Sequence, residues 1–422
     1  MNEIYQLSDD GKTLLEVLDK RITHAVIPEG VTTIGVNAFA HCDSLQSVHI
    51  PEGVKRIEDG AFEKCFSLQK INVPSSVNYI GESAFCECDS LTSFDIPYGV
   101  TNIADYTFAL CTSLQHIFIP NSVNRIMNSA FYQCTSLQSV NIPDSVTVIE
   151  ECAFEDCYLL KSINIPNGVT KINFATFSYC ISLQNVNIPN TVTYIDDNSF
   201  QFCTTLKKIT LPDSVTYIGY EVFEECEALE EVTIPSSVSM IGAESFKKCN
   251  SLRHIDIPSG ITSIGSGLFA CCSSLQRITI PDHIKEIEER AFCGCKYLQD
   301  ISIPDHIDKI NGYTFCECSS LRNIDLPKSL TIIEDCAFSD CTSLQNIRIP
   351  GNVSKIGYGI FEDCTSLNEI YILIADIEKC SINTGAFDNF DCDNCTLYVP
   401  EGRAEAYKSH RVLGKFKNIV EE

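Results

Sequence analysis

Prolines recur at an invariant interval along this chain. Fifteen of its 16 prolines lie 23 residues apart, from Pro28 to Pro350, and only Pro400 lies outside this register. Between successive prolines the sequence follows the pattern P-x-x-V-x-x-I-x-x-x-A-F-x-x-C-x-S-L-x-x-I-x-I. A fixed period of about 20–50 residues indicates an architecture in which each unit stacks on its neighbours. The chain is therefore predicted to be a solenoid, and its function must be sought on a surface.

The invariant apolar positions predict how each unit folds. Counting from each proline as position 0, every unit carries Ile at +6 (Ile34 to Ile356), Phe at +11 (Phe39 to Phe361) and Leu at +17 (Leu45 to Leu367). L-x-x-I-x-I alternates like a strand with one buried face, V-x-x-I marks a second short extended stretch, and A-F-x-x-C is long enough for one helical turn. We expect a right-handed repeat solenoid with a parallel β-sheet on one face, short strands and single helical turns elsewhere, and capped ends.

The register divides the chain into three segments. Residues 1–21 contain two short apolar runs around an Asp-Gly turn and are predicted to form an N-terminal β-hairpin cap. Residues 22–372 hold the 23-residue repeats. Pro350 and Pro400 are separated by two periods plus four residues, so 373–422 is predicted to contain degenerate repeats and a C-terminal cap with a short helix. Because each coil contacts only its neighbours, one elongated domain is expected.

The repeat unit resembles a known family. Its 23-residue length, its I-P strand end and its A-F-x-x-C-x-S-L segment are similar to those of BspA-like leucine-rich repeats, over residues 22–372. The closing segment Leu397–Gly402 is also similar to the end of such proteins. The resemblance implies a leucine-rich-repeat-like coil and a cell-surface or secreted protein with a role in adhesion or interaction.

Charge and hydropathy argue against several classes of partner. The chain has 30 Lys and Arg against 56 Asp and Glu, for a net charge of −26, which repels phosphate backbones and anionic lipids. Residues 1–6 lack the basic and apolar stretches of a signal peptide, and no apolar run approaches the roughly 18 residues of a membrane span. We expect no nucleic-acid partner and no membrane insertion. The sequence as written predicts a cytoplasmic location, whereas the resemblance implies the cell surface or secretion.

The 24 cysteines are interpreted mainly as core residues. Fifteen of them, from Cys42 to Cys364, occupy position +14 in phase with the apolar positions, which favours free, buried thiols over a disulfide framework. Equivalent positions of neighbouring coils are still close enough for oxidation. Cys293 and Cys316, both at +12, leave open a cross-coil bridge beside the alternative of variable filler residues.

The repeat presents no convincing catalytic or metal site. His283 and His306 fall one coil apart at a turn position, where solvent-facing turn residues are the simpler interpretation. Cys392 and Cys395, even with Cys380, do not complete a zinc site. Serines recur in every coil without a neighbouring His and acid, so none is distinguished as a nucleophile. The chain is predicted to be no enzyme and to hold no cofactor or metal.

The outward positions of the predicted strand carry the candidate binding residues. Strand alternation directs +19 and +21 away from the core, and Phe118 breaks the polar pattern at +21. An exposed aromatic side chain on a rigid sheet suits a binding hot spot. Charges on this face alternate between coils as far as Arg277 and Asp300, which we interpret as cross-strand pairing. The predicted partner-binding residues are His116, Phe118, Lys70, Asp95, Lys207, Lys208, Glu230, Glu231, Arg253 and His254.

These features favour a non-catalytic protein-binding scaffold, monomeric and with a preformed binding face. The first hypothesis is a surface or secreted adhesion or interaction protein, through the resemblance. The alternative is an intracellular structural or assembly scaffold, favoured by free thiols and by the lack of an export sequence. A third hypothesis, a carbohydrate-binding module, requires aromatic platforms in adjacent coils, for which the stacked Tyr194 and Tyr217 are candidates. Tyr371 occupies the same outward position as Phe118.

Overall fold

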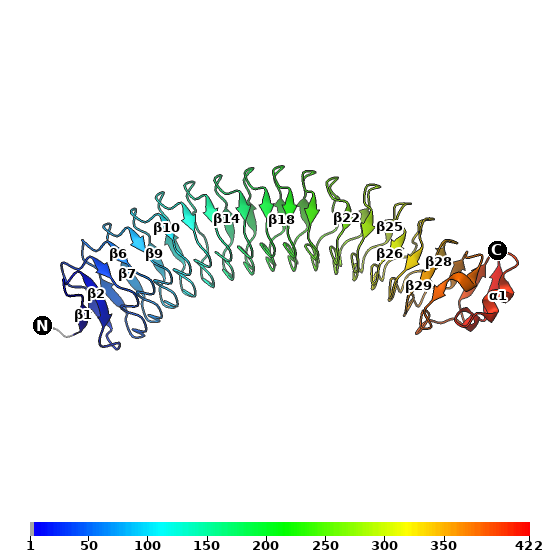
Figure 1. Cartoon of the computed structure of the whole chain (residues 1–422), viewed down its shortest axis with the longest axis horizontal. Coiled ribbons are helices and arrows are strands. Elements are labelled where there is room, and N and C mark those ends of the chain that lie inside the picture. The colour runs from blue at the N-terminus through cyan, green and yellow to red at the C-terminus, as the bar shows by residue number, and fades with distance from the viewer. Residues whose placement is uncertain (1–3) are drawn as a thin grey trace. The chain divides into compact units, whose positions relative to one another are not determined.

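The computed structural model describes residues 4–422, so that residues 1–3 of the predicted N-terminal cap lie outside the described residues. The chain forms two compact units, Met1–Val215 and Thr216–Glu422, and each is described by itself. Within each unit, short parallel strands repeat from coil to coil (Figure 1). The predicted repeat solenoid with parallel strands is confirmed.

The L-x-x-I-x-I segments form one strand-bearing side of the coils, here called the I-x-I face. Neighbouring strands pair in parallel with an offset of one repeat, so Ser47 lies opposite Lys70 and Val48 opposite Ile71. The strands of unit 1 are β3 (His24–Val26), β5 (Ser47–His49), β7 (Lys70–Asn72), β9 (Ser93–Asp95), β11 (His116–Phe118), β14 (Ser162–Asn164), β16 (Asn185–Asn187) and β18 (Lys208–Thr210). Those of unit 2 are β20 (Glu231–Thr233), β23 (Arg277–Thr279), β25 (Asp300–Ser302), β28 (Asn346–Ile349), β30 (Glu369–Ile372), β32 (Thr396–Val399) and β33 (Asn418–Glu421).

The V-x-x-I segments form a second series of shorter strands, here called the V-x-x-I face. They also pair in register, with Ile34 opposite Ile57 and Ile57 opposite Ile80. In unit 1 they are β4 (Thr33–Ile34), β6 (Arg56–Ile57), β8 (Tyr79–Ile80), β10 (Asn102–Ile103), β12 (Arg125–Ile126), β13 (Val148–Ile149), β15 (Lys171–Ile172) and β17 (Tyr194–Ile195). In unit 2 they are β19 (Tyr217–Ile218), β21 (Met240–Ile241), β22 (Ser263–Ile264), β24 (Glu286–Ile287), β26 (Lys309–Ile310), β27 (Ile332–Ile333), β29 (Lys355–Ile356) and β31 (Ser381–Ile382).

The A-F-x-x-C segment does not form the predicted helical turn. Positions +7 to +16, here called the turn edge, make successive hydrogen-bonded turns, as when the Ala38 N–H donates to Gly35 and the Cys42 N–H to Phe39. Positions +9 and +13 have positive φ, 56° at Asn37 and 58° at His41 in the first coil. A right-handed helix cannot continue through a left-handed residue, so the expectation of single helical turns in the repeats is wrong.

The turn edge is also joined from coil to coil by hydrogen bonds that run in one direction. The backbone N–H groups at +9, +11 and +13 donate to carbonyl groups of the following coil. In the first coil the N–H of Phe39 donates to the Ala61 oxygen at 2.8 Å and that of His41 to the Glu63 oxygen at 2.9 Å. Because these bonds lie between coils, stacking satisfies backbone groups that one coil alone would leave unpaired.

The core consists of columns of equivalent side chains. Successive +11 phenylalanines stack in each unit, with ring centroids of Phe108 and Phe131 5.6 Å apart and those of Phe131 and Phe154 5.2 Å apart. The +14 thiols form another column, and thiols of this column donate to the +11 carbonyl oxygen of the preceding coil, as Cys157 does to Phe131 at 3.3 Å. The sulfur thus fills core volume and gives the buried phenylalanine carbonyl a further donor.

Both ends of the described chain depart from the repeat. At the N-terminal end β1 (Tyr5–Leu7) and β2 (Thr13–Val17) pair antiparallel, and β2 continues into the V-x-x-I sheet beside β4. At the C-terminal end the pairing offset grows from 23 residues to 26 between β29 and β31 and to 27 between β30 and β32. The 3₁₀ helix η1 (Ile377–Lys379) lies within this insertion, and a second one, η2 (Leu413–Lys415), follows the short helix α1 (Ala404–Ser409).

Helix α1 closes the C-terminal end through one buried tyrosine. Tyr407 is fully buried, and its hydroxyl lies 3.0 Å from the Ile372 carbonyl oxygen and 2.7 Å from that of Ile374. Both carbonyls lie where the regular register ends. The hydroxyl therefore attaches α1 to the last regular coil.

Replacing Tyr407 by Phe is expected to destabilise unit 2 by about 1–3 kcal/mol, because a buried backbone carbonyl loses the hydroxyl as its donor. Guanidinium unfolding followed by circular dichroism measures the loss. The matched control is Tyr297→Phe at an exposed tyrosine, which should change stability by less than about 0.5 kcal/mol. Equal stability of both variants would contradict the role of the hydroxyl.

Candidate interaction surface

Three consecutive coils of unit 1 bring together four of the predicted contact residues. Strand β9 pairs with β11, so that Phe118 lies opposite Asp95, while His116 lies opposite Ser93. Lys70 is on β7 of the preceding coil, and all four predicted residues are exposed on the I-x-I face. This arrangement follows from strand alternation together with the exact 23-residue repeat.

The exposed aromatic surface at this place is larger than the sequence indicated. Tyr98, which follows Pro97, lies against Phe118 with ring centroids 5.9 Å apart and planes at 60°. The Tyr98 side chain is 71% exposed and that of Phe118 is 44% exposed. Two adjacent aromatic rings left in water form an apolar surface that a partner can cover.

Tyr98 was not predicted, because strand alternation identifies only positions +19 and +21 as outward and Tyr98 is at +1. A signal was present, since Tyr98 is the only aromatic residue at +1 in the fifteen repeats, where the other coils carry polar or small residues. The Ile96 N–H donates to the Phe118 carbonyl at 3.1 Å, so the pairing of the coils extends to the residue just before Pro97. This hydrogen bond brings the turn carrying Tyr98 beside Phe118.

The layer beneath these aromatic residues is well packed. Phe94 of β9 is buried and points inward, with ring centroids 4.9 Å from Phe85 and 4.8 Å from Phe108. Other coils carry Ile or Val at this position. The larger aromatic core under β9 and β11 gives the exposed cluster a rigid base. We call Lys70, Asp95, Tyr98, His116 and Phe118 the aromatic cluster.

The second predicted group is divided between the two units. Lys207 and Lys208 belong to unit 1, whereas Glu230, Glu231, Arg253 and His254 belong to unit 2, and all six are exposed. Within unit 2, the Nε2 atom of His254 lies 3.0 Å from the Asp256 carboxylate.

The interpretation of charges on the I-x-I face as cross-strand pairs is not met at Arg277 and Asp300. Arg277 and Asp300 are register partners, but no ion pair joins them in the described structure. Ion pairs between coils join Arg125 and Glu150 on the V-x-x-I side at 3.0 Å and Lys64 and Glu87 on the turn edge at 3.6 Å. On the I-x-I face, Arg348 of β28 pairs with Glu422 at 2.7 Å. Arg125 and Glu150 are 25 residues apart, so they occupy different positions of the 23-residue repeat. A comparison of one repeat position across the coils does not reveal such a pair.

A second exposed apolar group lies on the turn edge of unit 1. Its residues come from repeat positions +13, +15 and +16. The residue type varies there from coil to coil, so the repeat pattern does not indicate which of these side chains face outward. Tyr179 stacks on Phe202 with centroids 4.3 Å apart. The exposed members are Tyr158, Leu159, Tyr179 and Ile181, here called the turn-edge patch. It is the main alternative contact surface in unit 1.

Aromatic residues at the C-terminal end are stacked on one another. Tyr371 and Tyr398 have ring centroids 4.4 Å apart and planes at 9°, and the Arg348 guanidinium lies 4.1 Å from the Tyr371 centroid. The faces of the Tyr371 ring are therefore covered. Lys171 lies similarly over Tyr194, at 4.8 Å. A carbohydrate platform requires an open ring face, so this geometry does not favour the carbohydrate-binding hypothesis at these residues.

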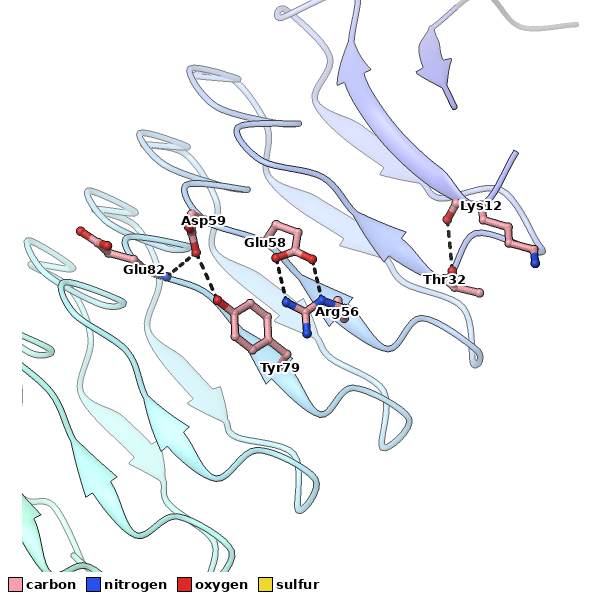
Figure 2. Close-up of polar contacts among 7 residues, drawn as sticks. All are labelled: Lys12, Thr32, Arg56, Glu58, Asp59, Tyr79 and Glu82. Carbon is pink, nitrogen blue, oxygen red and sulfur yellow. Dashed lines mark hydrogen bonds and ion pairs between the residues drawn. The ribbon is translucent and has the colours of Figure 1, made fainter. Parts of the chain in front are cut away.

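Polar side chains on the V-x-x-I face connect neighbouring coils, as Figure 2 shows near the N-terminal end. Arg56 donates to both carboxylate oxygens of Glu58, at 2.6 and 3.1 Å, and lies 3.8 Å from the Tyr79 centroid. Asp59 accepts from the Glu82 N–H at 3.0 Å and from the Tyr79 hydroxyl at 3.4 Å. Burial and the nearby acids raise the pKa of Tyr79, so the phenol stays neutral.

A shallow hollow of about 310 Å³ lies beside this network. Its polar groups are engaged in structural hydrogen bonds: Asp105 accepts from the Asn128 N–H at 2.8 Å, and Arg125 pairs with Glu150. Of the candidate metal ligands, His306 makes a 2.6 Å contact through Nε2 with the Ile284 carbonyl oxygen. Within residues 4–422, no group of three or more His, Cys, Asp or Glu side chains is arranged to hold a metal ion.

This geometry, a stack of short parallel coils around ladders of Leu, Ile and Phe, defines the class of leucine-rich repeat proteins. The family model described as the BspA type leucine rich repeat region matches residues 18–138, 101–229, 170–299 and 286–401. The chain belongs to this family. Among curated proteins, none matches the chain significantly.

Solved structures agree with this assignment. A leucine-rich repeat protein from Bacteroides ovatus is similar with a TM-score of 0.61 and 28% identity, over 94% of this chain and 91% of that one. A leucine rich cell surface protein from Faecalibacterium prausnitzii is 30% identical over 88% of this chain and 93% of that one, with a TM-score of 0.47. The pneumococcal vaccine antigen PcpA, at 16% identity and a TM-score of 0.52, covers 99% and 93% and shares the fold.

Proposed function

We propose that this protein is a non-catalytic scaffold that binds a protein partner through the I-x-I face of unit 1. The observation that carries the proposal is the exposed pair Tyr98 and Phe118 on a well-packed sheet. Large aromatic side chains at the centre of an interface supply much of its binding energy. Since the sheet is already ordered, little conformational entropy would be lost on binding.

The charged members of the aromatic cluster are suited to the rim of such an interface. Lys70, Asp95 and His116 are exposed, and none of them forms an ion pair in the described part of the chain. Exposed rim charges chiefly affect association rate and specificity. The net charge of −26 favours a partner whose surface is basic outside the aromatic contact.

Adhesion or interaction at a cell surface is the finer form of this proposal, and it rests on membership of the family. An intracellular assembly scaffold is the second candidate, favoured by the 24 free cysteines. No helix within residues 4–422 is long and apolar enough to cross a membrane. Fractionation of native cells with thiol titration separates the two candidates, because a cytosolic protein with reduced cysteines would exclude the adhesion role.

Replacing both Tyr98 and Phe118 by Asp is expected to weaken partner binding at least tenfold, because charged groups would replace the apolar contact surface; tenfold corresponds to about 1.4 kcal/mol. Binding is measured by biolayer interferometry on immobilised protein against purified host-surface and matrix proteins, and by capture from extracts of the native cell. Circular dichroism verifies that the variant is folded.

Tyr297→Asp is the control, since it places the same charge at an exposed tyrosine of unit 2. It should bind as the wild type does. If the variant at Tyr98 and Phe118 binds as tightly as the wild type, the contact lies elsewhere. Loss of binding in Tyr179→Asp with Ile181→Asp would then assign it to the turn-edge patch.

A further inference from the structure

The cysteines of this chain fall into two chemically different groups. The +14 thiols donate to backbone carbonyls, as Cys318 does to Phe292 at 3.2 Å, and they are buried. Desolvation by burial raises the pKa of Cys157 well above its usual value. A thiol that is buried, protonated and already hydrogen-bonded is a poor nucleophile. These residues are structural.

Cys293 and Cys316 do not belong to that column. Both are at +12, in adjacent coils of unit 2. Hydrogen bonds on either side of Cys293 hold the two coils in register here, from the Phe292 N–H to Thr314 at 3.0 Å and from the Gly294 N–H to Cys316 at 2.7 Å. The two side chains are therefore neighbours across the junction of these coils, and each affects the ionisation of the other.

The pair is also accessible from one side. Cys293 is partly exposed, whereas Cys316 is 8% exposed. A third cysteine, Cys271, lies in the preceding coil, and its N–H donates to the Cys293 carbonyl at 2.6 Å. The Cys271 sulfur packs against Gly294, where a Cβ would lie only 3.0 Å from it. Because Cys293 itself is partly exposed, a small reagent can approach it from the turn edge.

We propose that Cys293 and Cys316 form a thiol–disulfide site that reacts with low-molecular-weight disulfides such as oxidised glutathione. Equivalent residues of stacked coils are about 4.8 Å apart, within the roughly 4.4–6.8 Å between Cα atoms that a disulfide requires. Oxidation would join the two coils covalently.

The exchange proceeds in two balanced steps. The Cys293 thiolate attacks one sulfur of oxidised glutathione, the glutathione S–S bond breaks, and one glutathione leaves as a thiolate that takes up a proton. The Cys316 thiolate then attacks the Cys293 sulfur and releases the second glutathione. Two protein thiols are oxidised to one disulfide, and one glutathione disulfide is reduced to two thiols.

The surroundings of the pair decide which cysteine attacks first, and Cys293 is the more exposed of the two. The neighbouring Cys316 thiol lowers the pKa of Cys293 against the effect of burial, whereas the pKa of Cys316 is raised. Arg290 also favours the Cys293 thiolate, whereas Glu317 opposes it. Asp340, from the next coil, further disfavours ionisation of Cys316. Cys293 is therefore the attacking residue and Cys316 the resolving one.

The test uses the full chain in buffers of defined ratio of reduced to oxidised glutathione, with disulfides mapped by peptide mass spectrometry. In the wild type, one disulfide between Cys293 and Cys316 is expected, while the Cys157 and Cys180 peptides stay reduced. In the Cys316→Ser variant, the reaction should stop at a glutathione adduct on Cys293. Cys293→Ser should form neither product, and Cys271→Ser should react as the wild type does.

Alkylation of the native, reduced protein gives a second measurement that needs no variant. Iodoacetamide should label Cys293 at least roughly tenfold faster than the +14 thiols, because only Cys293 is both partly exposed and lowered in pKa. Failure of the wild type to form the disulfide, a disulfide mapped to another pair, or labelling of Cys157 as fast as Cys293 would each overturn the proposal.

Discussion

Replacing Phe131 by Ala is expected to destabilise the protein by about 3–5 kcal/mol, the range for a buried phenylalanine whose cavity cannot collapse. Phe131 is fully buried, and the stacked rings of Phe108 and Phe154 occupy both of its sides. Neither ring can move into the gap without losing contact with its other neighbour. Chemical unfolding followed by circular dichroism measures the change.

The control for this experiment keeps an apolar side chain of similar volume. Phe131→Leu should lose less stability than Phe131→Ala, because the cavity is smaller. Equal stability of wild type and Phe131→Ala would contradict the column of stacked rings as the source of core stability. Hydrogen exchange should place the loss in the coils next to Phe131, since each coil contacts only its neighbours.

Replacing Leu110 by Pro is expected to cost more than about 3 kcal/mol and to open the turn edge at this coil. Leu110 is at +13 with φ of 61°, and its N–H donates to the Tyr132 carbonyl at 2.7 Å. Proline fixes φ near −65° and has no N–H. Both the backbone conformation and the hydrogen bond to the next coil are therefore lost. Guanidinium unfolding measures the effect.

Glycine at the same position gives the informative comparison. Leu110→Gly removes the cost of a left-handed residue with a side chain, about 1–2 kcal/mol, against about 0.5–1 kcal/mol of extra backbone entropy. The expected result is no loss, or a gain of up to about 1 kcal/mol. At Thr112, which has no positive φ, glycine should destabilise instead. A loss of stability in Leu110→Gly as large as in Leu110→Pro would contradict this account.

The repeat pattern was sufficient to predict the stacked coils and their core. Ile34, Phe39 and Leu45 recur without a change of spacing, and a column of identical side chains can form only if the coils are stacked in register. The short helix after Pro400 was also predicted correctly, as α1, because Glu405 and Lys408 suit its first and last turns. At these places the repeat period and the local residue preferences indicate the same structure.

The turn edge could not be predicted in the same way. Most of its left-handed residues, such as Lys64 and Leu110, are not glycine, so the usual sequence signal for positive φ is weak. Their conformation is stabilised by hydrogen bonds to the next coil, and this tertiary contact overrides local preference. A single-coil pattern such as A-F-x-x-C suggests a helical turn because it contains no information about the neighbour.

The candidate site was predicted only in part. Phe118 and His116 were found because strand alternation identifies outward positions. Tyr98 was not, because it follows the proline and becomes part of the cluster only through contact with the next coil. The neighbouring thiols Cys293 and Cys316 could be named from the sequence, because they share one repeat position in adjacent coils. Contacts between side chains of adjacent coils, such as that of Tyr98 with Phe118, cannot be predicted from the pattern of a single coil.

The one-way hydrogen bonds of the turn edge make the two ends of a stack chemically unlike. The first coil presents acceptors that no earlier coil can fill, and the N-terminal hairpin supplies a donor, the Val17 N–H, to the Ala38 oxygen. The last regular coil presents donors, and the degenerate coil after it supplies acceptors such as the Ala386 oxygen, which accepts from the Ile360 N–H. The closing segments therefore cannot be exchanged. Within each unit, whole coils can be duplicated or deleted, because the described junctions repeat the same polarity.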